Sequence, residues 1–111
     1  MNENLESFEQ LEQFRRSNVV AAVYFSGPDC AVCSALKPKV YERLGEAFPR
    51  LALAEVDCGS AVELASQLSV FTIPTLIVYF DGREFMRKVR NFSPAELVAE
   101  LERPYGMCFD E

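Results

Sequence analysis

The sequence contains no histidine and no tryptophan among its 111 residues. Without histidine, the chain cannot build a Ser–His or Cys–His nucleophile pair, a histidine general base, or a zinc site with imidazole ligands. Any catalysis must therefore use thiols, carboxylates, tyrosines or lysines.

Long apolar runs and basic clusters are also missing. No stretch approaches the roughly 20 apolar residues of a membrane span, and the N-terminal segment has neither the basic start nor the apolar core of a signal peptide. The 11 basic residues are outnumbered by 17 acidic ones, and the net charge of −6 argues against nonspecific nucleic-acid binding. We therefore expect a cytoplasmic protein that binds neither nucleic acid nor membrane.

Four cysteines are present, and two of them, Cys30 and Cys33, are separated by only two residues. Because the cytoplasm keeps thiols reduced, we expect no structural disulfide framework. A Cys-x-x-Cys pair is typical of a redox site, but it also occurs as half of a metal site or as two incidental core cysteines. Zinc and iron–sulfur clusters normally need four ligands, so a site would require Cys58 and a fourth ligand from Cys108 or a carboxylate. We expect no metal, and we interpret Cys58 as a partly buried thiol at a strand end.

Hydrophobic periodicity predicts one domain over residues 1–104 and a C-terminal tail over residues 105–111. Helices are expected at residues 4–16, 31–48, 61–68 and 94–103, and strands at residues 19–25, 51–57, 75–80 and 83–89. Asp81-Gly82 predicts a tight hairpin between the last two strands. Ser93 and Pro94 are typical of a helix start, and Pro104 is expected to end that helix.

The predicted order α-β-α-β-α-β-β-α indicates an α/β fold. Buried strands joined by helices imply parallel crossovers, and the hairpin adds an antiparallel strand. The expected architecture is a mixed four-stranded sheet with helices on both faces. The cysteine pair follows the first strand and therefore lies at the carboxyl end of the sheet, where sites form in open α/β sheets.

Disulfide exchange needs one thiolate that attacks and a second thiol close enough to release the mixed disulfide. At a helix start, two intervening residues bring both sulfurs within bonding distance and leave the first outermost. The partial positive charge of the helix N-terminus stabilises a thiolate at Cys30. We therefore expect Cys30 to be the nucleophile and Cys33, one turn into the helix, to be the buried resolving thiol.

The sequence resembles the thioredoxin family over nearly its whole length. Four features carry the resemblance: Val23-Tyr24-Phe25-Ser26 before the cysteine pair, Pro38 after it, Thr72-Ile73-Pro74-Thr75-Leu76-Ile77, and Phe80-Asp81-Gly82-Arg83 with the closing helix. The resemblance implies a thioredoxin fold and a thiol–disulfide oxidoreductase that acts on protein disulfides through Cys30-Ala31-Val32-Cys33. The family's first strand has no counterpart in the predicted elements.

The same resemblance implies a cis bond between Ile73 and Pro74, with Ile73, Pro74 and Thr75 shaping a substrate-docking groove. It implies no bound cofactor, but turnover would need an external reductant such as a thioredoxin-reductase-type enzyme. Phe71, in the loop before Pro74, is expected to pack in the core, with an apolar rim for a partner as the alternative. A missing first strand would expose a sheet edge, so both a monomer and a weak homodimer are open.

Three positions depart from the family pattern. Asp29 stands where the family usually has tryptophan, and its charge is expected to raise the pKa of the neighbouring Cys30. Tyr24 replaces a buried aspartate, and an apolar residue near Leu53 replaces the lysine beside it. Tyrosine, with a pKa near 10, is a poor base at neutral pH. These departures keep a second hypothesis open, a thioredoxin-fold binding or redox-sensing module with weak or no turnover.

Overall fold

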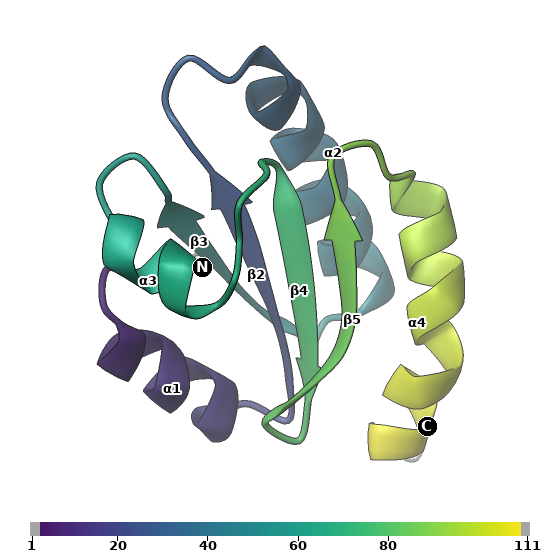
Figure 1. Cartoon of the computed structure of the whole chain (residues 1–111). Coiled ribbons are helices and arrows are strands. Elements are labelled where there is room, and N and C mark those ends of the chain that lie inside the picture. Colours follow the sequence, from purple (N-terminus) through teal and green to yellow (C-terminus); the bar gives the residue numbers. More distant parts are fainter. Residues whose placement is uncertain (1–2, 110–111) are drawn as a thin grey trace.

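A mixed β-sheet forms the centre of the structure, a computed structural model that describes residues 3–109 (Figure 1). Its strands are β1 (Glu3–Asn4), β2 (Val20–Ser26), β3 (Ala52–Asp57), β4 (Thr75–Phe80) and β5 (Arg83–Val89), in the order β1-β3-β2-β4-β5. Strands β1, β3 and β2 are parallel, and β4 is antiparallel to both β2 and β5. The helices are α1 (Phe8–Ser17), α2 (Ala31–Ala47), α3 (Val62–Gln67) and α4 (Pro94–Phe109). The predicted α/β fold is confirmed.

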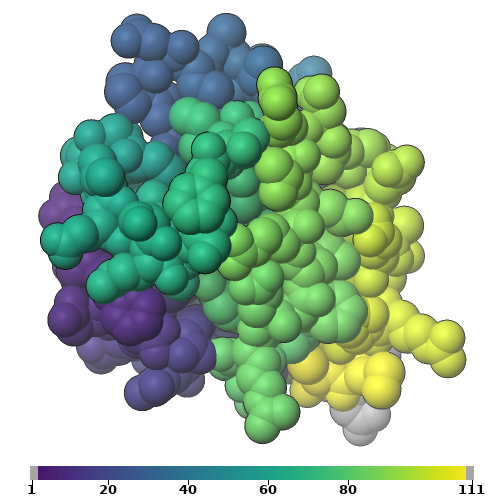
Figure 2. Space-filling view, viewed as in Figure 1, coloured from purple at the N-terminus to yellow at the C-terminus, as the bar shows by residue number. Residues whose placement is uncertain are grey.

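Helices cover both faces of the sheet, so the central strand β2 is buried from Val20 to Phe25. Side chains of a strand point alternately to its two faces. Val23 and Phe25 accordingly pack with α1 and α3, whereas Ala22 and Tyr24 pack with α2 and α4. Strand β5 lies at one edge of the sheet and forms the surface between α3 and α4 (Figure 2).

The sheet has five strands, so the prediction of four strands and a missing first strand is wrong. Glu3 and Asn4 pair with β3, and the N–H of Leu5 donates a hydrogen bond of 2.9 Å to the carbonyl of Glu55. Helix α1 starts later than predicted because Ser7 is its N-cap and accepts a hydrogen bond from a backbone N–H. A two-residue strand is too short to show a period of two, so only its pairing with β3 reveals it.

The hairpin between β4 and β5 forms as predicted. Both turn residues have positive φ, 55° at Asp81 and 82° at Gly82, which a two-residue type I′ connection requires. Arg15 of α1 donates a hydrogen bond to the carbonyl of Gly82 and fixes the turn against the rest of the domain.

Helix α4 does not end at Pro104 but continues to Phe109, so the predicted tail at 105–109 is part of the fold. Tyr105 is 7% exposed, its ring centroid lies 4.7 Å from that of Phe48, and its hydroxyl accepts a 3.0 Å hydrogen bond from the N–H of Arg50. The free energy gained by burying Tyr105 exceeds the cost of the helical hydrogen bond that Pro104, which has no N–H, cannot donate. The end of the predicted tail, residues 110–111, lies outside the described residues. Within residues 3–109, no helix is both long and apolar enough to cross a membrane.

Candidate active site

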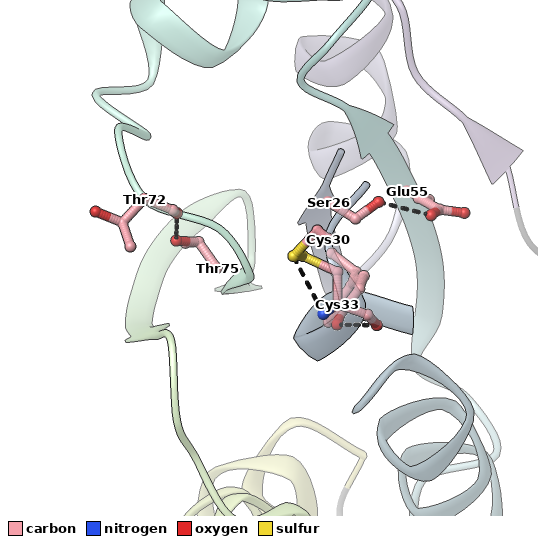
Figure 3. The surroundings of a disulfide bond; sticks show 7 residues. Ser26, Cys30, Cys33, Glu55, Thr72 and Thr75 are labelled. Carbon is pink, nitrogen blue, oxygen red and sulfur yellow. Dashed lines mark hydrogen bonds between the residues drawn. A yellow bond between two sulfur atoms is a disulfide. The ribbon is translucent and has the colours of Figure 1, made fainter. Parts of the chain in front are cut away.

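The cysteine pair lies where β2 passes into α2. The loop between them turns sharply at Asp29, whose φ is 56°, and Cys30 is the N-cap of α2 in an extended conformation. Cys30 and Cys33 form a disulfide with their Cα atoms 5.3 Å apart (Figure 3). Cys33 is 2% exposed, whereas Cys30 is partly exposed. The predicted pair is therefore assembled, with the first sulfur outermost.

The backbone of α2 provides a stabilising contact for a Cys30 thiolate. The Sγ of Cys30 accepts a hydrogen bond from the N–H of Cys33 at 3.2 Å. The first turn of α2 contains no acidic residue that would oppose the positive end of the helix. Asp29, the neighbouring acid, is an exposed loop residue, so its charge is screened by solvent.

The second wall of the site is the segment before β4. The Ile73–Pro74 bond is cis, Pro74 is buried, and its carbonyl accepts a 2.7 Å hydrogen bond from the N–H of Arg90. Thr75 closes the turn by donating its hydroxyl to the carbonyl of Thr72 at 2.6 Å (Figure 3). Antiparallel pairing of β2 with β4 places Thr75 opposite Phe25, at the same end of the sheet as the cysteines.

This wall also touches the loop that carries the cysteines. A Cβ added to Gly27 would lie only 2.8 Å from the Cδ1 of Ile73, so the glycine permits this close approach. Ile73, Pro74 and Thr75 therefore border the site with Cys30 and Cys33. Phe71 does not pack in the core as predicted, because 81% of its side chain is exposed.

A thioredoxin family model matches residues 2–103 of the chain. The chain belongs to the thioredoxin family. It is 34% identical over 103 residues to the thioredoxin-like protein YdfQ of Bacillus subtilis, covering 93% of this chain and 91% of that protein. It is also 32% identical to the thioredoxin of Bacillus subtilis, covering 77% of this chain and 81% of that protein. Among solved structures, a single-substitution mutant of the thioredoxin from Halobacterium salinarum superimposes with a TM-score of 0.81 at 27% identity, covering 94% of this chain and 89% of that one.

Members of the thioredoxin family are thiol–disulfide oxidoreductases, and the Cys30–Cys33 pair is at disulfide distance. The chain is accordingly a thiol–disulfide oxidoreductase. The family acts on protein disulfides and is reduced by thioredoxin reductase.

Tyr24 lies directly against Cys33. It is fully buried, and its hydroxyl donates a 2.8 Å hydrogen bond to the carbonyl of Cys33. Burial, with the nearby charge of Glu55, raises the pKa of Tyr24 to about 12. The phenol therefore stays protonated at neutral pH and holds the backbone of Cys33, as expected for a poor base.

The site also contains three residues that the sequence did not predict: Ser26, Lys37 and Glu55. Lys37 Nζ and Glu55 Oε1 are 2.6 Å apart. The Ser26 hydroxyl donates a hydrogen bond to Glu55 Oε2 at 2.9 Å (Figure 3). With Cys33, these residues line a polar cavity of about 350 Å³. One signal was present in the sequence, because Glu55 is an acidic residue inside the otherwise apolar stretch Leu51–Val56.

The remaining cysteines take no part in the pair. Cys58 is partly buried after β3, and burial together with Asp57 raises the pKa of its thiol. Cys108 is exposed on α4. Across residues 3–109, no group of three or more His, Cys, Asp or Glu side chains is placed to hold a metal ion.

Proposed function

We propose that this protein reduces disulfide bonds in other proteins, with Cys30 as the attacking thiol and Cys33 as the resolving thiol. The unequal placement of the two sulfurs carries this assignment. Cys30 is partly exposed at the N-terminus of α2, whereas Cys33 is 2% exposed one turn further on. A folded partner reaches the outer sulfur first.

The exchange proceeds in two balanced steps. The Cys30 thiolate attacks a substrate disulfide, forms a mixed disulfide and releases the first substrate sulfur as a thiolate. Cys33 then attacks the Sγ of Cys30, which forms the Cys30–Cys33 disulfide and releases the second substrate thiolate. Two electrons pass to the substrate. No bound cofactor is needed, because the sulfur atoms carry the electrons themselves.

We propose that Ile73, Pro74 and Thr75 form the edge against which an extended substrate segment docks. Their place beside the cysteine loop supports this role, as do two exposed apolar side chains near the site, Phe71 at 81% and Val32 at 50% exposure. A mostly apolar groove of about 530 Å³ also runs along Val32 between α2 and the start of α4. Exposed apolar surface of this kind suits a protein partner better than a small polar thiol.

We further propose a cytoplasmic location and reduction by a thioredoxin-reductase-type enzyme. The two unpaired cysteines, Cys58 and Cys108, fit a compartment that keeps thiols reduced. We propose that the protein acts as a monomer, because β1 covers the edge of β3 whose exposure would have favoured pairing.

A trapping experiment with insulin as the disulfide substrate tests the roles of the two thiols. The Cys33→Ser variant should accumulate a mixed disulfide between Cys30 and insulin, identified by mass spectrometry. Cys30→Ser, the matched control, should trap none. Trapping by Cys30→Ser, or no adduct with Cys33→Ser, would overturn the assignment.

A binding or redox-sensing module with weak turnover is the second candidate, and Tyr24 is the observation that favours it. With its raised pKa, the phenol cannot take a proton from Cys33 at neutral pH. This candidate expects Cys33→Ser to capture insulin normally while the wild type reduces insulin slowly in the presence of thioredoxin reductase and NADPH. Reduction at the rate of the Bacillus subtilis thioredoxin, assayed side by side, would dismiss it.

A further inference from the structure

Cys33 must lose its proton before it can attack, because the thiolate is the nucleophile. It is buried in the helix, and the hydroxyl of Tyr24 donates a hydrogen bond to the Cys33 carbonyl instead of accepting the thiol proton. A thiol with an ordinary pKa near 8.5 is only a few per cent ionised at neutral pH. A proton acceptor near Cys33 would therefore accelerate the release of substrate.

The polar cavity beside Cys33 contains such an acceptor. Glu55 projects from β3 and is held by two hydrogen bonds, from Lys37 Nζ to Oε1 and from the Ser26 hydroxyl to Oε2. Its side chain is 21% exposed, so it is fixed in position yet in contact with solvent. Each carboxylate oxygen has two acceptor sites, and each can accept a further hydrogen bond from water in the cavity.

We propose that Glu55 accepts the thiol proton of Cys33, through water in this cavity, as Cys33 resolves the mixed disulfide. The inference rests on the dithiol exchange described above. The S–H bond of Cys33 breaks, its proton passes through water to Glu55, and the sulfur electron pair forms the bond to Cys30. The bond between Cys30 and the substrate breaks, and the substrate leaves as a thiolate that is protonated from solvent. Glu55 then returns its proton to solvent.

The other titratable groups around Glu55 are less suited to accept the proton of Cys33. Lys37 of α2 is a cation, and burial raises the pKa of Tyr24 on β2 and of Tyr41 on α2, so both phenols stay protonated. Strand β1 contributes the uncharged Asn4 to the cavity. Asp57 also lines the cavity, but it is exposed and its Oδ1 accepts the N–H of Gly59 at 2.8 Å, in the loop after β3. Glu55 is therefore the carboxylate that is both fixed and beside α2.

The resolving step can be followed alone with dithionitrobenzoate, a coloured disulfide reagent. The reduced protein is studied with Cys58 and Cys108 replaced by serine, so that a first phase reports attack by Cys30 and a second reports attack by Cys33. With a carboxylate as acceptor, the second-phase rate constant should be nearly independent of pH from about pH 6 to 8, a range above the ordinary pKa of a carboxyl group and below that of a thiol. A second-phase rate constant that rises about tenfold for each pH unit over that range would overturn the proposal, and this test requires no change at Glu55.

The variant test uses Glu55→Gln, with Asp57→Asn as a matched control that removes a neighbouring negative charge. Glu55→Gln should slow the second phase by roughly 100-fold at about pH 6, and the deficit should shrink as the pH rises. The first phase should not change, and Asp57→Asn should leave both phases as they are. An unchanged second phase in Glu55→Gln, an equal loss in Asp57→Asn, or a deficit independent of pH would refute the role of Glu55. A wild type without any second phase would instead refute the resolving role of Cys33.

Discussion

Replacing Tyr24 with phenylalanine should destabilise the protein at neutral pH and stabilise it in strong alkali. The hydroxyl of Tyr24 is buried and donates a 2.8 Å hydrogen bond to the Cys33 carbonyl. A hydrogen bond of this kind contributes about 1 kcal/mol net to the free energy of unfolding. The variant should therefore be about 1 kcal/mol less stable than the wild type at pH 7.

The sign reverses at high pH because the pKa of Tyr24 is raised in the folded state, from 10.0 to about 12. Below pH 10 the phenol is protonated in both the folded and the unfolded state, and Tyr24 makes its full contribution to the free energy of unfolding. Between about pH 10 and 12 the unfolded chain loses this proton while the folded chain retains it, so the stability of the wild type falls with pH. Each pKa unit corresponds to about 1–2 kcal/mol, so the full loss is roughly 3 kcal/mol. Phenylalanine does not titrate, and the two stability curves should cross at about pH 11.

Equilibrium unfolding in guanidinium chloride at a series of pH values measures both curves. The oxidised proteins should carry Cys58→Ser and Cys108→Ser to prevent disulfide exchange in alkali. Groups that do not interact with Tyr24 titrate equally in both proteins and cancel in the difference. Two curves that stay parallel through about pH 12, or a variant that is the more stable at pH 7, would refute the argument.

Three further predictions concern the core, the C-terminal helix and the loop before Cys30. Leu44→Ala, which truncates a fully buried side chain of α2 in the core shared with the sheet and α4, should cost about 2–5 kcal/mol of unfolding free energy in urea. Tyr105→Ala should cost about 3–5 kcal/mol in the same assay, because the side chain packs on Phe48, and an unchanged midpoint would contradict the placement of residues 105–109 in the fold. Asp29→Asn should speed alkylation of Cys30 by iodoacetamide up to about fivefold at low salt, because an exposed charge is worth at most about 1 kcal/mol; an equal rate in both proteins would show that this charge does not act on the thiol.

The sequence by itself determined the elements whose signals are local. Strands β4 and β5 have the predicted bounds because Asp81-Gly82 requires positive φ at both positions and thereby fixes the hairpin. The start of α4 at Pro94 follows from Ser93, whose hydroxyl accepts the N–H of Glu96 at 3.3 Å. The Cys-x-x-Cys spacing likewise determined that the two sulfurs meet, since both lie within one turn at the start of a helix.

Only the tertiary structure decided the features that depend on segments far apart in the chain. Two residues form β1 because β3 offers them a partner, and α4 passes Pro104 because Tyr105 finds a pocket against Phe48. The cavity beside Cys33 arises because parallel pairing sets Glu55 opposite Tyr24, within reach of Lys37 on α2. Periodicity and capping act over one or two turns of chain, whereas pairing and burial become defined only when distant segments meet.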